Sequence, residues 1–536
     1  MKIWKPVVAG AVVMTLPALE AFAQQQTAAQ QSEIFLDKMT VTTTRNPLPA
    51  FDAPGMVTVI DREDIEAAQA SSPDDILRFV PGVEFVGGPR RTGETPSIRG
   101  FEGADVVVLF DGVRQNFGSA HDGRFFIDPE MLRSVEVLRG SASSLYGSGG
   151  TGGVLDFRTV RAADFLEPGE SFGGRISAGY QDVNTEEFGS LTAYARSDSG
   201  FDVIANFTLR DSDEIDLGGG GKLENADDEV AAGMFKAGGV FKEDHYFEGS
   251  YLGFFNVAEE PNNGQGVGGP DAVKKDISYQ PFRLAYDYEN PDDRLLNLDI
   301  VAYYARSSAD EQRLDNLGNG PAGELATRDV DTVGFRIDNR SAFGLAETFD
   351  PLFTYGVEYY RDQQDGKAGG GPRDGVPNAE ANTFGVFAQA ELTLDALGPI
   401  PGELLFVPGV RFDYYDIESD IAAGATTETA ISPRIALTYK PAPWAMTFFS
   451  YGEAFRAPTF DELFLTGLHF QIPIGPGVNN FFVPNPDLKP QRTETYEFGG
   501  GLQFDDVIAR GDRAQAKGSY FFIYGEDSIA LAVNQP

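Results

Sequence analysis

The stretch that decides the fold runs from Val135 to Val154 and reads VEVLRGSASSLYGSGGTGGV. Its first four residues are typical of a buried strand, and Val154–Phe157 reads as a second strand after a glycine-rich loop. Gly147 to Gly152 match the spacing G-x-G-x-x-G, but a dinucleotide site requires a helix directly after the glycines. Because a strand follows instead, we interpret these glycines as residues of tight turns.

The residues on both sides of this stretch predict a compact α+β unit that covers residues 50–165. One helix of this unit is predicted to begin at Pro73. Ser72 can cap its N-terminus, Pro73 suits its first position and Asp75 can act as the acid of a capping box. Further strands are expected at Met56–Ile60 and Val106–Phe110, and a further helix is expected at Arg62–Ala68.

Residues 171–536 have a different texture. Segments of about ten residues alternate apolar and polar positions, and linkers rich in Gly, Asp and Asn separate them. Long linkers, such as Gly218–Asp228 and Gly366–Ala379, alternate with short turns, as in a transmembrane β-barrel with long loops on one side. A soluble β-sandwich is the alternative, but the export signal at the N-terminus favours the barrel.

The N-terminus has the form of a secretory signal peptide, predicted at residues 1–23. Lys2 and Lys5 precede the apolar stretch Val7–Leu19, and Ala21-Phe22-Ala23 supplies the small residues at which signal peptidase cuts. A membrane anchor is the alternative, but the apolar stretch is short for a spanning helix. The mature chain is expected to begin near Gln24, with a periplasmic tether over residues 24–49.

Composition excludes several classes of function. The formal net charge of −39 repels phosphates, so no nucleic-acid partner is expected. There are no cysteines, so a thiolate metal site or a cysteine nucleophile is impossible. No nucleophile–base set or carboxylate pair stands out either, and an enzyme is not predicted.

Several motifs together resemble one known family. Val135–Gly140, Ser144–Gly147 and Gly152–Val154, with Ser97–Phe101 and Phe110–Val113, look like the plug domain of TonB-dependent outer-membrane receptors. The resemblance runs from about Asp37 to Phe504. It implies an N-terminal α+β plug inside an all-β barrel of the 22-stranded type, located among outer-membrane lipid in a Gram-negative bacterium.

The resemblance also suggests how such a receptor would be energised. It implies that Asp37, Lys38, Met39, Thr40, Val41, Thr42 and Thr43 form a TonB box, the segment that engages the energy-transducing protein TonB. From the residues alone, this β-prone segment could add to the sheet edge of a partner, but the first strand of the domain that follows is the better interpretation.

Histidine positions point to the haem and haemoglobin receptor branch of the family. The chain has 3 histidines. His121 lies in the plug, and His469 lies between a Phe455-Arg456-Ala457-Pro458 box and an Asn485-Pro486-Asp487-Leu488 box, as in that branch, where Asn usually stands in place of Asp487. The resemblance implies that His121 and His469 bind haem iron, with haem, free or from haemoproteins, as transported ligand and with no permanent cofactor.

The chemistry is consistent with this implication. Imidazole is a suitable axial ligand for haem iron, and it binds in its neutral form, so uptake is expected to weaken in acid. His245 has no motif around it and is predicted to lie at a strand end.

Alternatives remain open at this point. Phe-Arg-Ala-Pro boxes also occur in receptors for ferric siderophores, so a ferric-siderophore or other metal-chelate receptor is the main alternative. A passive porin would need neither a plug nor a TonB box, and a secreted β-enzyme would need an active site. Arg456 could neutralise a haem propionate, but we interpret it as a structural partner of Glu453 or Glu462.

Chain length leads to one last expectation. Residues 171–536 leave room for about 16 to 18 strands with their loops, where plugged transporters have about 22. The barrel is therefore expected to be incomplete at its C-terminus, with a first and a last strand that do not meet.

Overall fold

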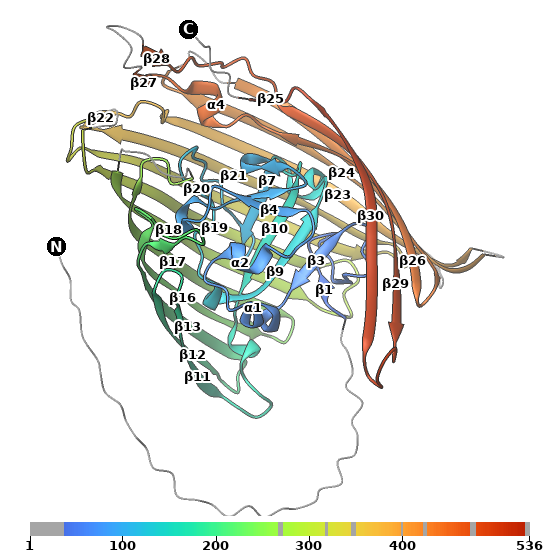
Figure 1. Ribbon diagram of the computed structural model, residues 1–536. Coiled ribbons are helices and arrows are strands. Elements are labelled where there is room, and N and C mark those ends of the chain that lie inside the picture. The colour runs from blue at the N-terminus through green and yellow to red at the C-terminus, as the bar shows by residue number, and fades with distance from the viewer. Residues whose placement is uncertain are drawn as a thin grey trace, which may run out of the picture. The chain divides into compact units, whose positions relative to one another are not determined.

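The computed structural model describes residues 37–265, 272–316, 320–344, 350–397, 400–421, 426–471 and 479–530 (Figure 1). The predicted signal peptide lies outside these residues. Asp37–Gln503 and Gln515–Pro536 belong to one compact unit, whereas Phe504–Ala514 belong to another.

A small domain precedes the large sheet in the chain. Its elements are β3 (Val57–Ile60), α1 (Arg62–Ala68), α2 (Pro73–Leu77), β4 (Val83–Val86), η1 (Arg91–Gly93), β5 (Thr95–Ile98), β6 (Phe101–Glu102), η2 (Gly103–Asp105), β7 (Val106–Phe110), β8 (Val113–Arg114), η3 (Pro129–Met131), β9 (Leu132–Arg139), α3 (Ser143–Tyr146), β10 (Gly153–Thr159) and η4 (Ala162–Asp164). The expected strands and the expected helix at Arg62–Ala68 are all present. A strand, β10, does follow the glycine-rich loop, as the interpretation of Gly147–Gly152 required.

The centre of the small domain is a five-stranded sheet in the order β3-β9-β10-β7-β8. β10 runs parallel to β7 and antiparallel to β9. The stretch Val135–Val154 therefore contains the end of β9 and the start of β10, which are neighbours in this sheet. Gly153 must be a glycine, because its φ is +147° and a Cβ atom there would lie 2.0 Å from the carbonyl oxygen of Leu138. The start of α2 is also as predicted, since the Asp75 carboxylate accepts hydrogen bonds from the backbone of Ser71 at 2.8 Å and of Ser72 at 3.4 Å.

The segment before the small domain contains β1 (Met39–Thr40) and β2 (Leu48–Pro49). These two strands pair with each other in a separate two-stranded sheet. The segment Asp37–Thr43 is therefore not a strand of the five-stranded sheet.

The large sheet contains 16 strands among the described residues, nearly all linked in chain order by antiparallel ladders. They are β11 (Phe172–Gln181), β12 (Glu186–Arg196), β13 (Phe201–Ser212), β16 (Asp227–Phe241), β17 (His245–Pro261), β18 (Ala272–Glu289), β19 (Asn297–Arg313), β20 (Leu325–Ala342), β21 (Leu352–Ala368), β22 (Gly371–Pro372), β23 (Ala379–Leu397), β24 (Ile400–Ser419), β25 (Thr426–Ala442), β26 (Ala445–Arg456), β29 (Gln491–Asp505) and β30 (Arg513–Glu526). The connections carry β14 (Ile215–Asp216), β15 (Lys222–Leu223), α4 (Phe460–Phe464), β27 (Leu468–Gln471) and β28 (Asn479–Phe481).

The two faces of the large sheet have opposite polarity. In β13, Phe207 and Leu209 are 54% and 50% exposed, whereas the polar Thr208 and Arg210 between and beside them are buried. Ile431 and Ile435 in β25 are likewise exposed, and Ser432 and Arg434 are buried. An apolar outer face and a polar inner face are what a sheet in contact with lipid requires. None of the helices in the described ranges has both the length and the apolar composition of a membrane-crossing helix.

The large sheet is open in its strand order. β11 and β30 stand at the two ends of that order, and no ladder joins them within the described ranges. This agrees with the expectation that the first and last strands do not meet. The number of strands implied by the resemblance, 22, is not confirmed, and the expectation of missing C-terminal strands stays a prediction.

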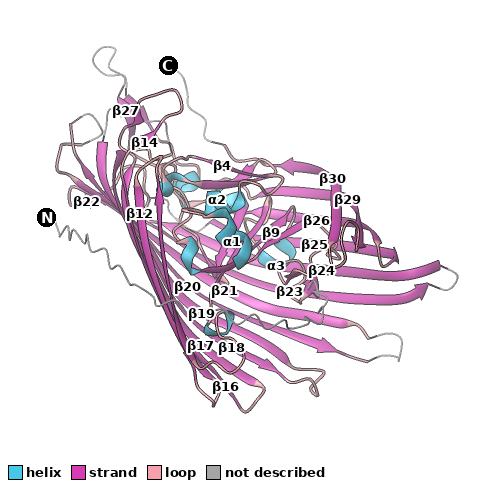
Figure 2. Cartoon of the chain, turned by 60° about the horizontal axis from the view of Figure 1, so that its bottom comes forward, coloured by secondary structure: helices cyan, strands magenta, loops and turns pink. Residues whose placement is uncertain are grey.

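The small domain lies against the inner side of the curved large sheet, as Figures 1 and 2 both show, and this is the side on which polar residues such as Arg210 are buried. Aromatic pairs cross the boundary, including Phe126 with Phe254 at 6.2 Å and Phe110 with Tyr279 at 5.4 Å between ring centroids. Largely buried ion pairs also cross it, namely Arg99–Glu497, Arg114–Glu358, Asp128–Arg210, Asp111–Lys236 and Asp122–Lys275, and Arg45 of the preceding segment pairs with Asp338. The position of the small domain on the sheet is therefore fixed largely by matched charges.

Candidate functional site

His121 lies in the connection between β8 and η3 of the small domain. The hydroxyl of Ser119 shapes this turn, because it accepts hydrogen bonds from the backbone of His121 at 3.1 Å and of Asp122 at 3.2 Å and donates to the Asp122 carboxylate at 2.7 Å. Within the described ranges, the His121 imidazole itself makes no hydrogen bond. Its ring is thus held in place by its loop and not by a partner of its own.

The environment keeps the His121 imidazole in the neutral form. Burial lowers its pKa, and the nearby carboxylates of Asp122 and Glu311 oppose this effect without cancelling it. A neutral imidazole offers a lone pair to a metal ion, whereas a protonated one does not. His121 is therefore in the right protonation state to act as a metal ligand near neutral pH.

His469 lies in the β27–β28 hairpin, which belongs to the long connection between β26 and β29. Its Nδ1 is 2.9 Å from the amide oxygen of Asn480, and its ring packs against Phe482 at 4.4 Å between centroids. An amide oxygen only accepts hydrogen bonds, so Nδ1 carries the proton and Nε2 carries the lone pair. The contact with Asn480 thus selects the tautomer in which Nε2 can ligate a metal.

The two histidines border the same connection, which links β22 to β23. The guanidinium of Arg373 in this connection is one of the charges that act on His121. The next residue, Asp374, accepts a hydrogen bond at 3.1 Å from the backbone of Leu468, beside His469. One connection therefore carries both a charge that acts on His121 and a carboxylate that binds the residue before His469.

A second bridge joins the same parts of the chain. Arg328 in β20 donates to the carbonyl oxygen of Gly118 at 2.6 Å and to the carboxylate of Asp461 in α4 at 3.0 Å. Gly118 precedes His121 by three residues, and α4 precedes the hairpin that carries His469. Figure 1 shows α4, β22, β27 and β28 at one end of the large sheet.

The other candidates of the sequence lie elsewhere. His245 is the first residue of β17, at a strand end as predicted, and its Nδ1 is 2.8 Å from the Tyr286 hydroxyl. Arg456 pairs with Glu462 at 2.7 Å and with Asp105 at 3.4 Å, so its structural interpretation holds, with Glu462 as the partner.

The segment Asp37–Thr43 is docked on the small domain. One carboxylate oxygen of Glu136, in β9, accepts hydrogen bonds from the hydroxyls of Thr40 at 2.6 Å and Thr42 at 2.5 Å and from the backbone of Val41 at 3.0 Å and Thr42 at 3.1 Å. The side chains of Thr40 and Thr42 are completely buried. Sequence reasoning missed Glu136 in this role, although an acid inside a buried strand was a signal that it has a specific partner.

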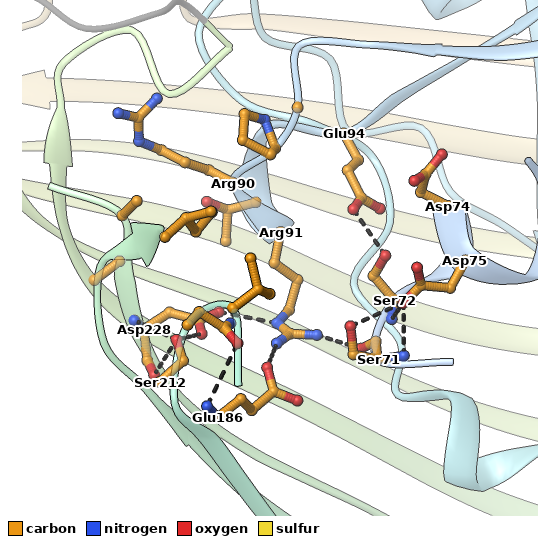
Figure 3. A pocket seen from close by; sticks show the side chains of 18 of the residues that line it. Ser71, Ser72, Asp74, Asp75, Arg90, Arg91, Glu94, Glu186, Ser212 and Asp228 are labelled. Atoms are coloured by element: carbon orange, nitrogen blue, oxygen red, sulfur yellow. Dashed lines mark hydrogen bonds and ion pairs between the residues drawn. The ribbon is translucent and has the colours of Figure 1, made fainter. Parts of the chain in front are cut away.

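A cavity of about 530 Å³ lies beside the site, between residues 71–94 of the small domain and the ends of β12, β13, β16 and β17 (Figure 3). Neither His121 nor His469 lines it. Arg91 is one of its lining residues and pairs with Glu186 at 2.5 Å and Asp228 at 2.9 Å. Glu94 accepts a hydrogen bond from Ser72 at 2.8 Å, and burial raises the pKa of its carboxyl group to about 8.

Family models match two parts of the chain, and relatives match nearly all of it. A model of the TonB-dependent receptor plug domain matches residues 49–154, and a model of the TonB-dependent receptor-like β-barrel matches residues 236–536. The chain is 34% identical over 534 residues to a hemin receptor of Yersinia pestis, and this alignment covers 98% of this chain and 76% of that protein. It is 30% identical to a heme/hemopexin utilization protein C of Haemophilus influenzae, over 97% of this chain and 76% of that protein.

Solved structures agree with these matches at the level of the fold. The hemophore receptor HasR of Serratia marcescens, in a complex with its hemophore HasA and heme, aligns with a TM-score of 0.76 and 24% identity over 88% of this chain and 73% of the receptor. The FrpB iron transporter of Neisseria meningitidis aligns with a TM-score of 0.70 and 17% identity over 88% of this chain and 72% of the transporter.

Proposed function

The chain belongs to the TonB-dependent receptors, and on that premise we propose that it imports haem across the outer membrane of a Gram-negative bacterium. Haem arrives free or from haemoproteins and is the transported ligand, not a resident cofactor. The function is transport and not catalysis. The named relatives, a hemin receptor and a heme/hemopexin utilization protein, support this choice of cargo.

One observation carries the proposal to particular residues. His121 and His469 come from parts of the chain almost 350 residues apart, yet the charge of Arg373 acts on His121 and the next residue, Asp374, binds the backbone of Leu468 beside His469. We assign these two histidines as the axial ligands of haem iron. Haem has two axial positions that accept imidazole, one on each face of the ring.

The division of the ligands between two parts of the molecule suits a transport cycle. His121 belongs to the small domain, whereas His469 belongs to a hairpin between strands of the large sheet. Haem held by both would be released when the small domain moves relative to the sheet, because either imidazole alone binds it less tightly. The ion pairs that hold the small domain in place would then set the energy that release requires.

Energy would enter through residues 37–43. We propose that this segment is a TonB box within a tether of residues 24–49, that residues 50–165 are the plug and residues 171–536 the barrel, and that residues 1–23 are the export signal. TonB would pair with the segment as an added strand, through main-chain hydrogen bonds. The contacts with Glu136 must break before this can happen, since they occupy the Val41 and Thr42 amides.

Titration of the purified protein with ferric haem, followed at the Soret band, tests the assignment. The wild-type protein should give a six-coordinate, low-spin spectrum. His121→Ala and His469→Ala should each remove one axial ligand and weaken binding about 10- to 100-fold. His245→Ala is the matched control and should behave like the wild type.

Two results would contradict the proposal. If the double variant His121→Ala/His469→Ala kept the wild-type affinity and spectrum, the two residues would not be the ligands. If the wild-type protein bound a ferric siderophore and gave no Soret change with haem, the siderophore alternative would replace haem import.

A further inference from the structure

The loop that carries His121, residues 118–123, is held from the side of the large sheet. We call it the His121 loop. The side-chain amide of Gln265 donates to the carbonyl oxygens of Asp122 at 2.6 Å and Ser119 at 3.3 Å, and its backbone amide donates to that of His121 at 3.3 Å. Arg328 donates to the carbonyl oxygen of Gly118 at 2.6 Å. The small domain thus presents the histidine, while the sheet side fixes the loop around it.

Lys275 in β18 makes the charged contact with this loop. Its ammonium group lies 2.6 Å from the carboxylate of Asp122 and 2.9 Å from that of Glu260 in β17. The three side chains are 1%, 3% and 1% exposed, respectively. Thr92 of the small domain donates to the Glu260 carboxylate at 3.2 Å, so the cluster joins two segments of the small domain to two strands.

Removal of the Lys275 ammonium group would displace the His121 loop. Asp122 and Glu260 would then be two buried carboxylates with no cation between them, and like charges repel strongly where water is excluded. Glu260 is fixed by the β17–β18 ladder, in which it pairs with Val273. The His121 loop is in no strand ladder and is held to the sheet side by separate hydrogen bonds from Gln265 and Arg328, so it is the partner that would shift away from the sheet.

Such a shift would carry the histidine with it. The Cα atoms of His121 and Asp122 are joined by one peptide unit, about 3.8 Å long. A site of this kind works only when its groups are held within about 0.5 Å of the productive geometry. The contact between Lys275 and Asp122 therefore bears directly on where the His121 imidazole lies.

We propose that Lys275 is a positioning residue for the His121 ligand: through Asp122 it holds the His121 loop where the imidazole can reach haem iron. This inference rests on the proposed haem function. It extends that function to a residue of the barrel wall that does not touch the cargo. It also makes coordination by His121 depend on the contact between the small domain and the sheet.

A purely structural role for Lys275 predicts something different. If the lysine only neutralised buried carboxylates, its loss would weaken haem binding by both histidines or by neither. Coordination by His121 would not change selectively. The spectrum of bound haem distinguishes the two roles, because it reports the number of axial imidazoles separately from the amount of folded protein.

The experiment compares ferric-haem spectra and affinities of purified full-length variants. Lys275→Met should change the spectrum toward that of His121→Ala and weaken binding about 10- to 100-fold. Lys275→Arg keeps a cation at this position and should restore a spectrum close to the wild type. Lys274→Met is the matched control, because Lys274 is the neighbouring residue of β18 on the exposed face, and it should have no effect.

A double-mutant cycle completes the test. If Lys275 acts through His121, His121→Ala/Lys275→Met should bind haem no more weakly than His121→Ala alone. Fully additive losses, or a wild-type spectrum in Lys275→Met, would overturn the proposal. A wild-type spectrum in His121→Ala would instead overturn the ligand assignment itself, so the two failures are distinguishable.

A second variant covers the case in which Lys275→Met does not fold. Lys275→Met/Glu260→Gln removes one positive and one negative charge, so the net charge of the cluster is unchanged while the hold on Asp122 is lost. It should give the same change toward the His121→Ala spectrum. A wild-type haem spectrum in this variant would overturn the proposal.

Discussion

Among single residues, Glu94 has an unusual position for a carboxylic acid. Its side chain is 6% exposed, one oxygen accepts the Ser72 hydroxyl, and its other oxygen has no hydrogen-bond partner within the described ranges. Burial raises the pKa of this carboxyl group to about 8, so the acid is neutral in the folded protein at neutral pH. In the unfolded chain the same group is ionised above about pH 4.5.

This difference predicts a pH-dependent stability. Between about pH 4.5 and pH 8 the folded state binds the extra proton, so the contribution of Glu94 to stability falls as the pH rises through this window. Glu94→Gln should therefore be more stable than the wild type at about pH 8, on the order of 2–4 kcal/mol, and nearly equal to it at about pH 4.5. Thermal unfolding of the detergent-solubilised protein across this range measures the difference.

Glu84→Gln provides the control for this prediction. Glu84 lies in β4 of the same small domain but is exposed. Its replacement should leave the pH dependence of the wild type unchanged. A Glu94→Gln variant with the same pH dependence as the wild type would show that the carboxyl group is ionised in the folded protein.

Among elements, the segment Asp37–Thr43 can be engaged in two ways. In the structure it is docked, with the Val41 and Thr42 amides bound to Glu136. As a TonB box it would need the same amides for pairing with a partner strand. Docking on Glu136 and pairing with a TonB strand are thus mutually exclusive, because both use the same main-chain amides.

Val41→Pro separates haem binding from energy coupling. Proline removes the amide donor and fixes the backbone angle φ, so a partner strand could not pair there. Haem binding should survive, whereas growth on haem as sole iron source should stop. The measurements are a Soret titration of the purified variant and a growth assay on haem.

Glu136→Ala is the matched variant for this element. It removes the docking acceptor but leaves every main-chain donor of the segment intact, so growth on haem should continue. If Glu136→Ala stopped growth as Val41→Pro does, the Val41 amide would be needed for docking on the small domain and not for pairing with TonB. If Val41→Pro abolished haem binding, the segment would support the fold of the small domain.

For the molecule as a whole, charge determines how the small domain is held. Arg114 of the small domain pairs with Glu358 of β21 at 3.1 Å, and Glu358 also pairs at 2.8 Å with Arg411 of β24, which is completely buried. Buried pairs of this kind add little net stability, but removing one partner can leave a buried charge uncompensated, here that of Arg114. The boundary is therefore specific in geometry and costly to perturb.

Glu358→Gln should loosen the small domain. It leaves the Arg114 guanidinium without its carboxylate partner, while Arg411 keeps its pair with Asp413 at 2.8 Å, and the change should cost about 3–5 kcal/mol. Hydrogen exchange of the small-domain amides in the full chain should become faster. Glu380→Gln is the control, because Glu380 forms an exposed pair with Arg361 and its loss should cost less than about 1 kcal/mol. Equal exchange in both variants would mean that the buried pair does not hold the domain.

The sequence by itself determined the local elements and the class of the fold. Glycine positions, capping residues and strand periodicity are local properties, and they predicted α1, β7 and the start of α2 at the residues where the structure has them. The alternation of apolar and polar residues likewise predicted a sheet with one face toward lipid, as Phe207 and Arg210 illustrate. The histidines could be selected because there are so few of them and because motifs surround two of them.

Only the tertiary structure decided how distant residues meet. Glu136 docks a segment about 95 residues away, and Lys275 contacts Asp122 across 153 residues. A charged residue inside a strand can signal that a partner exists, as Glu136 does, but the local sequence does not identify that partner. Burial and proximity assign the partner, and both arise only when the small domain packs against the large sheet.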